Sequence, residues 1–234
     1  MNNSNYAESA LPLVKKAIEE NFNSYYTENV YLPTVHRLLK VEKVTHLEWL
    51  FRVQYKGKVS AGQFMQVSLP RVGEVPISIA NFNEEEGWLD FLIRKVGKVT
   101  DEIFKLKEND RIFLRGPYGN GFPIDKYKNK NVILIVGGSG IAPVRPIIEY
   151  FTKHPEEMKS FKIIVGYKNY ESVIFEKEFS RWRKNIEILV TLDNAESARN
   201  LGKTENEFHE GMVTKYIPDL KIENMDETEF IVVG

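Results

Sequence analysis

The feature that most constrains the fold is the stretch from Val132 to Pro143, an apolar run that passes through glycines at 137, 138 and 140 and ends at a proline. The large aliphatic residues at 132–136 predict a strand buried on both faces, as in the centre of a parallel sheet. Pro143 suits the first turn of a helix, and glycines let a backbone approach a ligand closely. Because free N–H groups at a helix N-terminus attract anions, the segment indicates a phosphate site. A plain strand-to-helix connection fits it equally well.

The same segment departs from the standard dinucleotide-binding fingerprint in two places. Pro143 stands where that fingerprint has its third glycine. The next apolar run, 161–166, leads into Tyr167 and Lys168 and has no acidic residue at its end to hold a ribose. The loop therefore suggests a nucleotide site that is not a standard Rossmann site.

Composition argues against several classes of function. The chain has 234 residues, enough for two domains of roughly 100 residues each. Its formal net charge of −1, from 32 basic and 33 acidic residues, provides no field to attract nucleic acid or an anionic membrane. Cysteine is absent and the 4 histidines are scattered, so no metal site is predicted. With no membrane-spanning run and no signal-peptide pattern, the sequence predicts a cytoplasmic protein.

The pattern of apolar residues changes twice along the chain. Residues 1–30 predict an amphipathic helix over 10–22 and a linker, and this helix either packs on the body of the protein or docks on a partner. Residues 31–126 predict an antiparallel β-barrel of short strands. The expected strands are 49–55, 63–69, 75–79, 88–93 and 111–114.

Residues 127–234 predict an α/β domain with a parallel sheet covered by helices. The expected elements are strands at 132–136, 161–166, 186–191 and 230–233 and helices at 143–153 and 175–183. The fold class is therefore two-domain, β followed by α/β. The domain boundary is expected in the polar, charged stretch 124–130.

One segment of the barrel half ends a strand in cations. Residues 90–100 predict a strand ending in Arg94 and Lys95, then a glycine turn and a short helix at 101–106. A cationic strand end that faces a helix N-terminus suits a second phosphate. The same cations also suit a solvated edge, and the segment by itself favours that simpler interpretation.

A second barrel segment, 75–80, combines a proline with a hydroxyl. Pro76 predicts a sheet edge or a bulge, because proline has no N–H for a strand pair. Ser78 stands among aliphatic residues, where it can pair with a neighbouring strand or with the polar edge of a bound cofactor. Alone, the segment does not decide between these alternatives.

Taken in order, these pieces resemble the ferredoxin-NADP reductase superfamily over about residues 31–234. The matching motifs are Pro-Ile-Ser at 76–78, Gly-x-x-Thr at 97–100, Arg-Gly-Pro-Tyr-Gly-Asn-Gly-Phe at 115–122 and Gly-Gly-Ser-Gly-Ile-Ala-Pro at 137–143. Within the superfamily, segments 73–79, 94–103 and 113–122 look most like the electron-transfer flavoprotein subunit of anaerobic sulfite reductase. The electron-transfer subunits of sulfhydrogenases, including the gamma subunit, and of dihydroorotate dehydrogenase are similar in pattern.

The resemblance implies a flavin-binding barrel, an NAD(P)-binding α/β domain and a role for each matching residue. Ser78 would hydrogen-bond near flavin N5, the atom that accepts hydride, and is the expected catalytic residue. Pro76 and Ile77 would line the flavin ring. The flavin phosphates would be held by Gly97, Lys98, Val99 and Thr100, and Ile93 and Arg94 are further expected cofactor-binding residues. The dinucleotide would be held by Gly138, Ser139, Gly140, Ile141 and Pro143, with Tyr167 and Lys168 at its adenosine ribose or 2′-phosphate. FAD is the expected flavin ahead of FMN, and either NADH or NADPH fits.

The chain also departs from the family pattern. Val75 stands where many members have an arginine, which leaves neutralisation of the flavin phosphates to Arg94 or Lys98. The last strand ends in Val233 and Gly234, where many members have a cysteine and a glycine. The family also leads us to expect a [2Fe-2S] cluster, for which this sequence has no cysteine ligands. Because a buried strand normally leads into a covering element, we expect these residues to be a portion of a longer subunit.

Two functions of different class follow from these observations. The first is an NAD(P)H-oxidising flavoprotein electron-transfer subunit that passes electrons through flavin to another subunit of a reductase complex, with anaerobic sulfite reduction as the implied reaction. The second is a cofactor-depleted interaction or regulatory subunit with the same fold, which docks through helix 10–22. A yellow protein that NADH or NADPH bleaches indicates the first, and a colourless protein that takes up no FAD or FMN indicates the second. The sequence favours the first.

Overall fold

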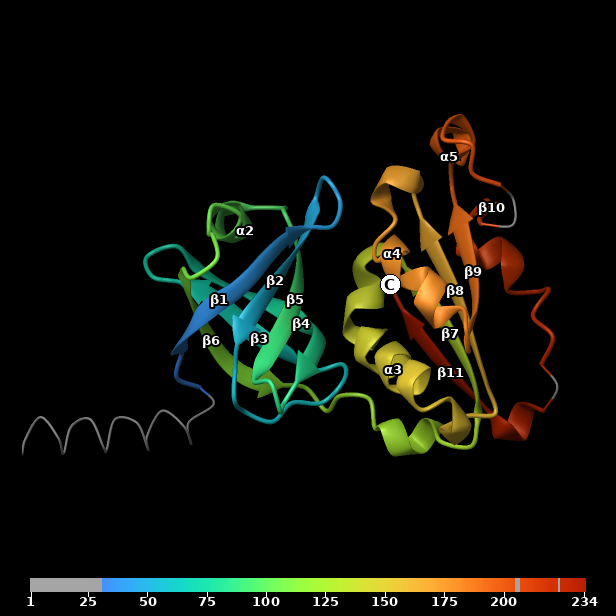
Figure 1. Ribbon diagram of the computed structural model, residues 1–234, viewed down its shortest axis with the longest axis horizontal. Helices are drawn as coiled ribbons and strands as arrows, with labels where there is room; N and C mark the ends of the chain where they lie inside the picture. Colours follow the sequence, from blue (N-terminus) through green and yellow to red (C-terminus); the bar gives the residue numbers. More distant parts are fainter. Residues whose placement is uncertain (1–30, 205–206, 223) are drawn as a thin grey trace, which may run out of the picture.

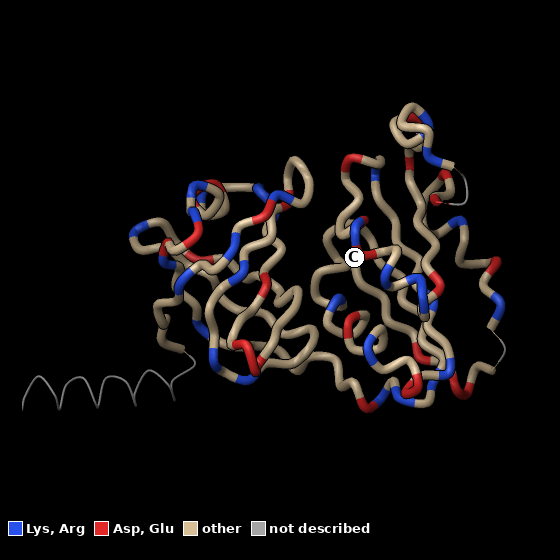
Figure 2. The backbone as a smooth tube through the Cα atoms, in the orientation of Figure 1, with Lys and Arg blue, Asp and Glu red and all other residues tan. Residues whose placement is uncertain are grey.

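A computed structural model describes residues 31–204, 207–222 and 224–234 (Figure 1). A β-barrel comes first in the chain, and an α/β domain lies beside it. The helix predicted over 10–22 lies outside the described residues. Basic and acidic residues are interspersed over both domains (Figure 2), in keeping with the net charge of −1. None of the helices in the described part of the chain is long and apolar enough to cross a membrane.

The barrel is a closed antiparallel sheet in the strand order β1-β2-β5-β4-β3-β6. Its strands are β1 (Thr34–Lys43), β2 (Glu48–Gln54), β3 (Phe64–Leu69), β4 (Gly73–Asn83), β5 (Trp88–Arg94) and β6 (Arg111–Tyr118). Side chains alternate between the interior and the outside of the barrel. Phe51 and Phe91 pair across β2 and β5 and are fully buried inside. Their neighbours Leu50 and Leu92 belong instead to the apolar cluster of the α/β domain.

The first half of β4 has a sheet partner on one side only. It pairs with β3 from Gly73 to Ser78, whereas its pairing with β5 begins at Ile79. Helix α2 (Lys98–Ile103) lies beside this stretch, since a Cβ on Gly73 would be 3.2 Å from a methyl group of Val99. The stretch is thus a local edge within a closed barrel. This confirms the edge predicted from Pro76, whose missing N–H needs no partner there.

The α/β domain is a parallel sheet in the order β10-β9-β8-β7-β11. Its strands are β7 (Asn131–Gly137), β8 (Ser160–Tyr167), β9 (Glu187–Leu192), β10 (His209–Glu210) and β11 (Thr228–Val233). Its α-helices are α3 (Ile141–Lys153), α4 (Glu176–Trp182) and α5 (Glu196–Asn200). Short 3-10 turns are η1 (Ile124–Tyr127), η2 (Gly138–Gly140), η3 (Pro155–Glu157), η4 (Tyr170–Ser172), η5 (Val213–Tyr216) and η6 (Met225–Glu227).

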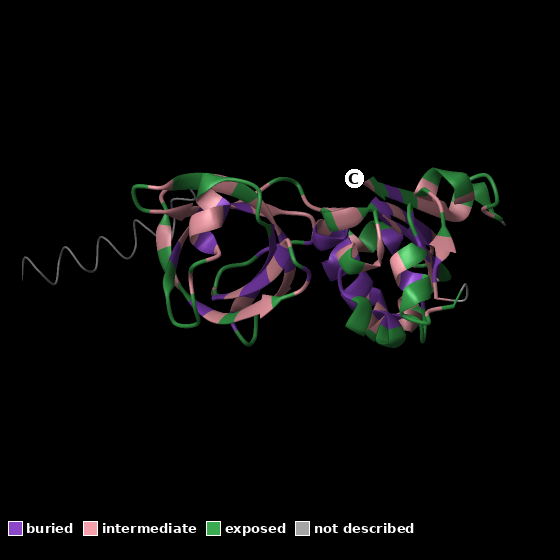
Figure 3. Ribbon diagram, turned by 90° about the horizontal axis from the view of Figure 1, so that it is seen from above, coloured by how far each residue is buried: buried purple, intermediate pink, exposed green. Residues whose placement is uncertain are grey.

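Helix α3 lies between the sheet of the α/β domain and the barrel (Figure 1). Leu50, Ala80 and Leu92 project from the outer face of the barrel and pack with the α/β core. Buried residues therefore continue from one domain into the other along α3 (Figure 3). Full burial of a leucine side chain stabilises by about 1.5–3 kcal/mol, so this apolar contact contributes substantially to holding the domains together.

Several predicted boundaries were wrong. The helix expected from Pro143 begins at Ile141, because η2 leads into it without a break. The helix expected at 101–106 is α2 at 98–103, which starts directly after Gly97. Strand β1 was not predicted, because only Leu38 of its residues is fully buried and its apolar and polar residues therefore alternate weakly.

Candidate functional site

The open half of β4 carries the sequence expected to line a flavin ring. Ile77 and Ser78 are half-buried there and Pro76 is exposed. Within the described residues, the Ser78 hydroxyl has no hydrogen-bond partner, so it is free to donate to or accept from a ligand. This stretch offers an apolar surface with one available hydroxyl.

The turn before α2 is held in shape by Thr100. Its Oγ1 accepts hydrogen bonds from the backbone N–H groups of Val96 at 2.9 Å and Gly97 at 3.0 Å, and donates to the Gly97 carbonyl at 2.9 Å. Thr100 is buried, so its hydroxyl shapes the expected phosphate cradle and does not face a ligand. Gly97 and Lys98 are exposed, and no atom lies within 4 Å of where a Gly97 Cβ would stand. The front of the turn is therefore open.

Of the other residues expected beside this turn, some pack in the barrel core and one lies on the surface. Ile93 is fully buried in the barrel interior, so its side chain does not reach a ligand. Val99 is half-buried and packs on the barrel core. Arg94 is exposed, with its Nε 3.4 Å from a carboxylate oxygen of Glu48. Arg94 and Lys98, the two cations expected to neutralise the phosphates, are thus both exposed near the turn.

The glycine turn after β7 needs glycine at two positions for different reasons. Gly138 has a φ of +50°, which disfavours other residues, and no atom lies within 4 Å of where its Cβ would stand. Gly140 has an ordinary helical φ of −58°, but a Cβ there would lie 3.1 Å from the Val233 carbonyl oxygen and 3.2 Å from Val136. Ser139 between them is exposed. The turn is packed against β11 on one side and open on the other.

Helix α3 and strand β11 support this turn from behind. Ile141 is fully buried in the α/β core, which makes it a packing residue. Pro143 is half-buried at the third helical position, where its missing N–H costs no helical bond. Because β11 pairs with β7 in parallel, Gly234 lies beside the turn, its Cβ position 3.9 Å from the Gly137 nitrogen.

The structure separates the two residues expected at the adenosine. Tyr167 is buried, and its hydroxyl donates to the carbonyl oxygen of Ile174 at 3.1 Å. Burial raises its pKa well above the ordinary value, so the hydroxyl stays protonated. The Tyr167 side chain thus points from β8 into the core of the α/β domain. It does not face a ribose. Lys168 is exposed, and it alone of the pair remains a candidate for that contact.

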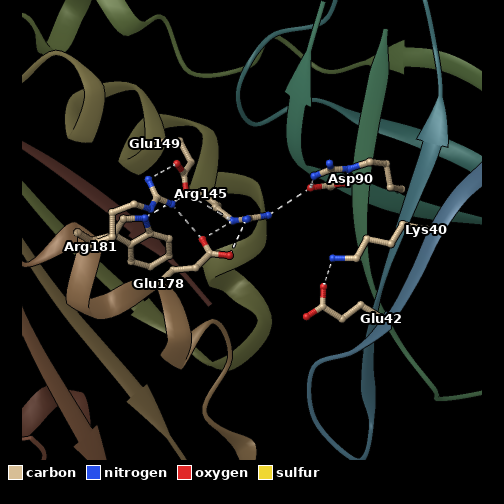
Figure 4. Close-up of polar contacts among 9 residues, drawn as sticks. Lys40, Glu42, Asp90, Arg145, Glu149, Glu178 and Arg181 are labelled. Carbon is tan, nitrogen blue, oxygen red and sulfur yellow. Dashed lines mark hydrogen bonds and ion pairs between the residues drawn. The ribbon is translucent and has the colours of Figure 1, made fainter. Parts of the chain in front are cut away.

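A cluster of buried charges joins the two domains at α3 (Figure 4). Asp90 of β5 has no exposed side-chain area and accepts two hydrogen bonds from Arg52, at 2.7 and 2.9 Å. Arg145 of α3 lies on its other side, with Nη1 3.5 Å from Asp90 Oδ2. Arg145 also donates to both carboxylate oxygens of Glu178 on α4, at 3.1 and 2.7 Å. An arginine of one domain thus bridges carboxylates of both.

The remainder of the cluster lies within the α/β domain. Glu149 accepts two hydrogen bonds from Arg181, at 2.8 and 2.6 Å, and one from the indole N–H of Trp182. Burial opposes ionisation of Glu149, but Arg181 and Arg145 outweigh it and lower its pKa. Burial raises the pKa of Glu178 to about 7, although the charge of Arg145 acts in the opposite direction.

Asp90 and Arg145 were not predicted from the sequence to have a role. A signal was present in both cases: Asp90 stands between Leu89 and Phe91 in an apolar strand, and Arg145 follows the apolar start of a helix. Charged residues are seldom fully buried unless they are paired, so each position indicated a buried partner. Which partner it was depended on how the two domains pack.

One group of possible metal ligands occurs in the described residues. His154, Glu156 and Glu157 bring ligand atoms within 4.8 Å of one another next to η3. Glu157 already accepts a hydrogen bond from Tyr150 at 2.7 Å and pairs with Lys128 at 3.1 Å. We assign no metal to this surface cluster, because exposed acidic groups often lie together without an ion.

Two family models match the chain, one for each domain. The model of the oxidoreductase FAD-binding domain matches residues 36–122, and the model of the oxidoreductase NAD-binding domain matches residues 134–234. The chain thus combines an oxidoreductase FAD-binding domain with an oxidoreductase NAD-binding domain, in the two-domain fold of ferredoxin-NADP reductases.

Curated relatives include gamma subunits of sulfhydrogenases and electron transfer subunits of dihydroorotate dehydrogenase B. The sulfhydrogenase 1 gamma subunit of Pyrococcus furiosus is 38% identical over 143 residues, 59% of this chain and 48% of the relative. The sulfhydrogenase 2 gamma subunit of that organism is 34% identical over 69% of this chain and 58% of the relative. Its probable dihydroorotate dehydrogenase B electron transfer subunit is 35% identical over 62% and 52%. The chain spans about half the length of the curated relatives it matches.

Solved structures agree on the fold. An NADH-dependent reduced ferredoxin-NADP oxidoreductase, described for flavin-based electron bifurcation, is 26% identical with a TM-score of 0.68, over 86% of this chain and 68% of that one. The ferredoxin reductase in carbazole 1,9a-dioxygenase has a TM-score of 0.70 at 17% identity, over 86% and 60%. The expected two-domain architecture is thereby confirmed.

Proposed function

We propose that this chain is an NAD(P)H-oxidising flavoprotein electron-transfer subunit, which takes a hydride from a nicotinamide cofactor and passes electrons to a partner reductase subunit. The observation that carries the proposal is the presence of two open surfaces, one on each domain. The unpaired half of β4 and the turn before α2 form one, and the glycine turn after β7 forms the other. FAD and a nicotinamide dinucleotide are the ligands that the two family models name.

The residues of the barrel fit a flavin. Pro76 and Ile77 offer an apolar surface for its ring, and Ser78 offers a hydroxyl without another partner in the described part of the chain. The open turn at Gly97 and Lys98, with Arg94 close in sequence, provides backbone N–H groups and positive charge for phosphates. Bound there, the flavin would supply hydride acceptance and one-electron release, which no side chain of this protein can provide.

The protein's own contribution is orientation. Ser78 would hold the reactive edge of the flavin through one hydrogen bond, and Gly138 would let the dinucleotide phosphates approach the backbone. Gly140 and Ile141 keep the turn in place against β11 and the core. Fixing two reactants at the correct distance converts a bimolecular step into one that behaves as unimolecular.

The partner follows from the relatives, whose names describe subunits of hydrogenase and dehydrogenase complexes. No cysteine occurs in the 234 residues, so none of them ligates a thiolate-held [2Fe-2S] cluster. Sulfite as the final acceptor rests on the sequence resemblance alone and stays a prediction. Co-purification from the native host with a sulfite reductase subunit would support it, and co-purification with another oxidoreductase would contradict it.

A flavin titration tests the proposal at its first step. Protein stripped of ligand is mixed with FAD or FMN, and bound flavin is measured after gel filtration. We expect one FAD per chain. A protein that retains neither flavin contradicts the proposal and supports the cofactor-depleted interaction subunit, an interpretation that the uncharged Val75 favours.

A further inference from the structure

The contact between Arg145 and Asp90 joins the two halves of the proposed site. Asp90 lies on β5, which runs from this contact to Arg94 and the turn before α2. It also pairs with Asn81 of β4, close to where β4 and β5 separate beside Ser78. Arg145 lies one helical turn after Ile141, where the glycine turn enters α3. Each end of the ion pair thus lies on an element that leads to one of the two ligand surfaces.

Arg145 is hydrogen-bonded to its own domain but not to the barrel. Arg145 makes two good hydrogen bonds inside its own domain, to Glu178. Its third nitrogen, Nη1, is buried, has no hydrogen-bond partner in the described structure and lies 3.5 Å from Asp90. Normal N–H···O bonds are about 2.7–3.2 Å long, so a small approach of α3 toward the barrel would complete this one. A buried donor without a partner favours such an approach.

We propose that Arg145 is a positioning residue that fixes the α/β domain against the barrel and thereby sets the distance between the nicotinamide and flavin surfaces. The apolar contacts of Leu50, Ala80 and Leu92 hold the domains together but permit sliding, since apolar packing has little directionality. The guanidinium, held by Glu178 and directed at a fully buried carboxylate, selects one orientation. The kinetic consequence of this proposal rests on the proposed function. Its structural consequence does not.

The structural test uses spin labels in the ligand-free protein. Because the chain has no cysteine, cysteines introduced at exposed Glu108 and Lys184 are labelled uniquely, one in each domain. Arg145→Met should broaden the distribution of distances between the labels about twofold or more, because it removes the directional contact. The matched control is Arg181→Met, which removes one positive charge from the same cluster at a residue whose ion pairs, within the described residues, are with Glu149 and Glu178 of its own domain. This control should keep the wild-type distribution.

The kinetic test uses the FAD-loaded protein and rapid mixing with NADH or NADPH. A misplacement of about 1 Å can cost about 100-fold in rate, so Arg145→Met should lower the limiting rate of flavin reduction by roughly 10- to 100-fold. The dinucleotide Kd and the flavin content should stay within about threefold of wild type, because Arg145 lines neither ligand surface. A merely structural role would instead lower flavin content or raise Kd.

A second variant keeps the test decisive if Arg145→Met does not fold. At a pH above 7, where the Glu178 carboxyl is ionised, Glu178→Gln removes the charged anchor of Arg145 and leaves the arginine beside Asp90. It should therefore broaden the distances less than Arg145→Met but more than Arg181→Met. The proposal is overturned if neither Arg145→Met nor Glu178→Gln broadens the distances, or if Arg181→Met broadens them equally. If neither dinucleotide reduces the wild-type protein, the proposed function fails, and the label distances still decide the role of Arg145.

Discussion

The two glycines of the turn after β7 allow stability and ligand binding to be separated. At Gly138, alanine meets no neighbouring atom but must adopt a φ of +50°, which costs about 1–2 kcal/mol for a residue with a Cβ. At Gly140 the backbone is ordinary, and alanine instead crowds the Val233 carbonyl oxygen at 3.1 Å, where overpacking costs about 1–3 kcal/mol. Both substitutions also reduce the conformational entropy of the unfolded chain, which increases the free energy of unfolding by about 0.4–1 kcal/mol.

The two variants should therefore lose similar stability, about 1 kcal/mol each, and a similar few degrees in Tm. They should differ in dinucleotide binding. The methyl group of Gly138→Ala projects into the open side of the turn, where the phosphates would lie, and should weaken binding about tenfold or more. The methyl group of Gly140→Ala projects toward β11 and should leave the Kd within about threefold of wild type.

Thermal unfolding by circular dichroism and calorimetric titration with NADH and NADPH measure the two effects on the same samples. Equal loss of binding in both variants would refute the assignment of the open side to the ligand. So would wild-type affinity in Gly138→Ala.

Three further predictions concern single contacts. Ser78→Ala should lower the rate of flavin reduction by roughly 3- to 10-fold, because it removes one hydrogen bond to the flavin. The flavin content should not change. The rate is measured by absorbance after rapid mixing. Because the folded-state pKa of Glu178 is about 7, above its ordinary 4.5, the native protein binds the extra proton, and stability should fall as pH rises from about 4.5 to about 7. The pKa of Glu149 is lowered, so the contribution of Glu149 to stability changes with pH only below about pH 4.5. If Glu178→Gln leaves the slope of Tm against pH unchanged, the prediction for Glu178 is wrong. Leu92→Ala should cost about 2–3 kcal/mol in denaturant unfolding, whereas exposed Val96→Ala should cost under about 0.5 kcal/mol.

Sequence periodicity predicted most of the α/β half of the fold, although it missed the short elements α5 and β10. The run at 132–136 is buried in β7 because a central parallel strand is covered on both faces, and this requirement leaves an apolar run in the sequence. The barrel was harder to predict. Strand β1 packs only Leu38 fully into the core, so its alternation is weak, and its pairing with β2 and β6 is a long-range property.

The candidate site was predictable at its turns and less so at its side chains. Gly138 and Ser78 could be proposed from the sequence, because a glycine in a tight turn and a hydroxyl among aliphatic residues both stand out locally. Tyr167 could not be assigned correctly, because the direction of its side chain depends on which face of β8 receives α3 and α4. Arg145 is the extreme case, since its partner Asp90 lies in another domain.

The central claim is that a flavin on the barrel faces a nicotinamide on the α/β domain. The most direct measurement is the visible absorbance of the FAD-loaded protein after one equivalent of NADH or NADPH is added without oxygen. We expect the flavin to bleach with at least one of the two dinucleotides, and more slowly in Ser78→Ala. Bound FAD that keeps its oxidised absorbance with both dinucleotides would contradict it.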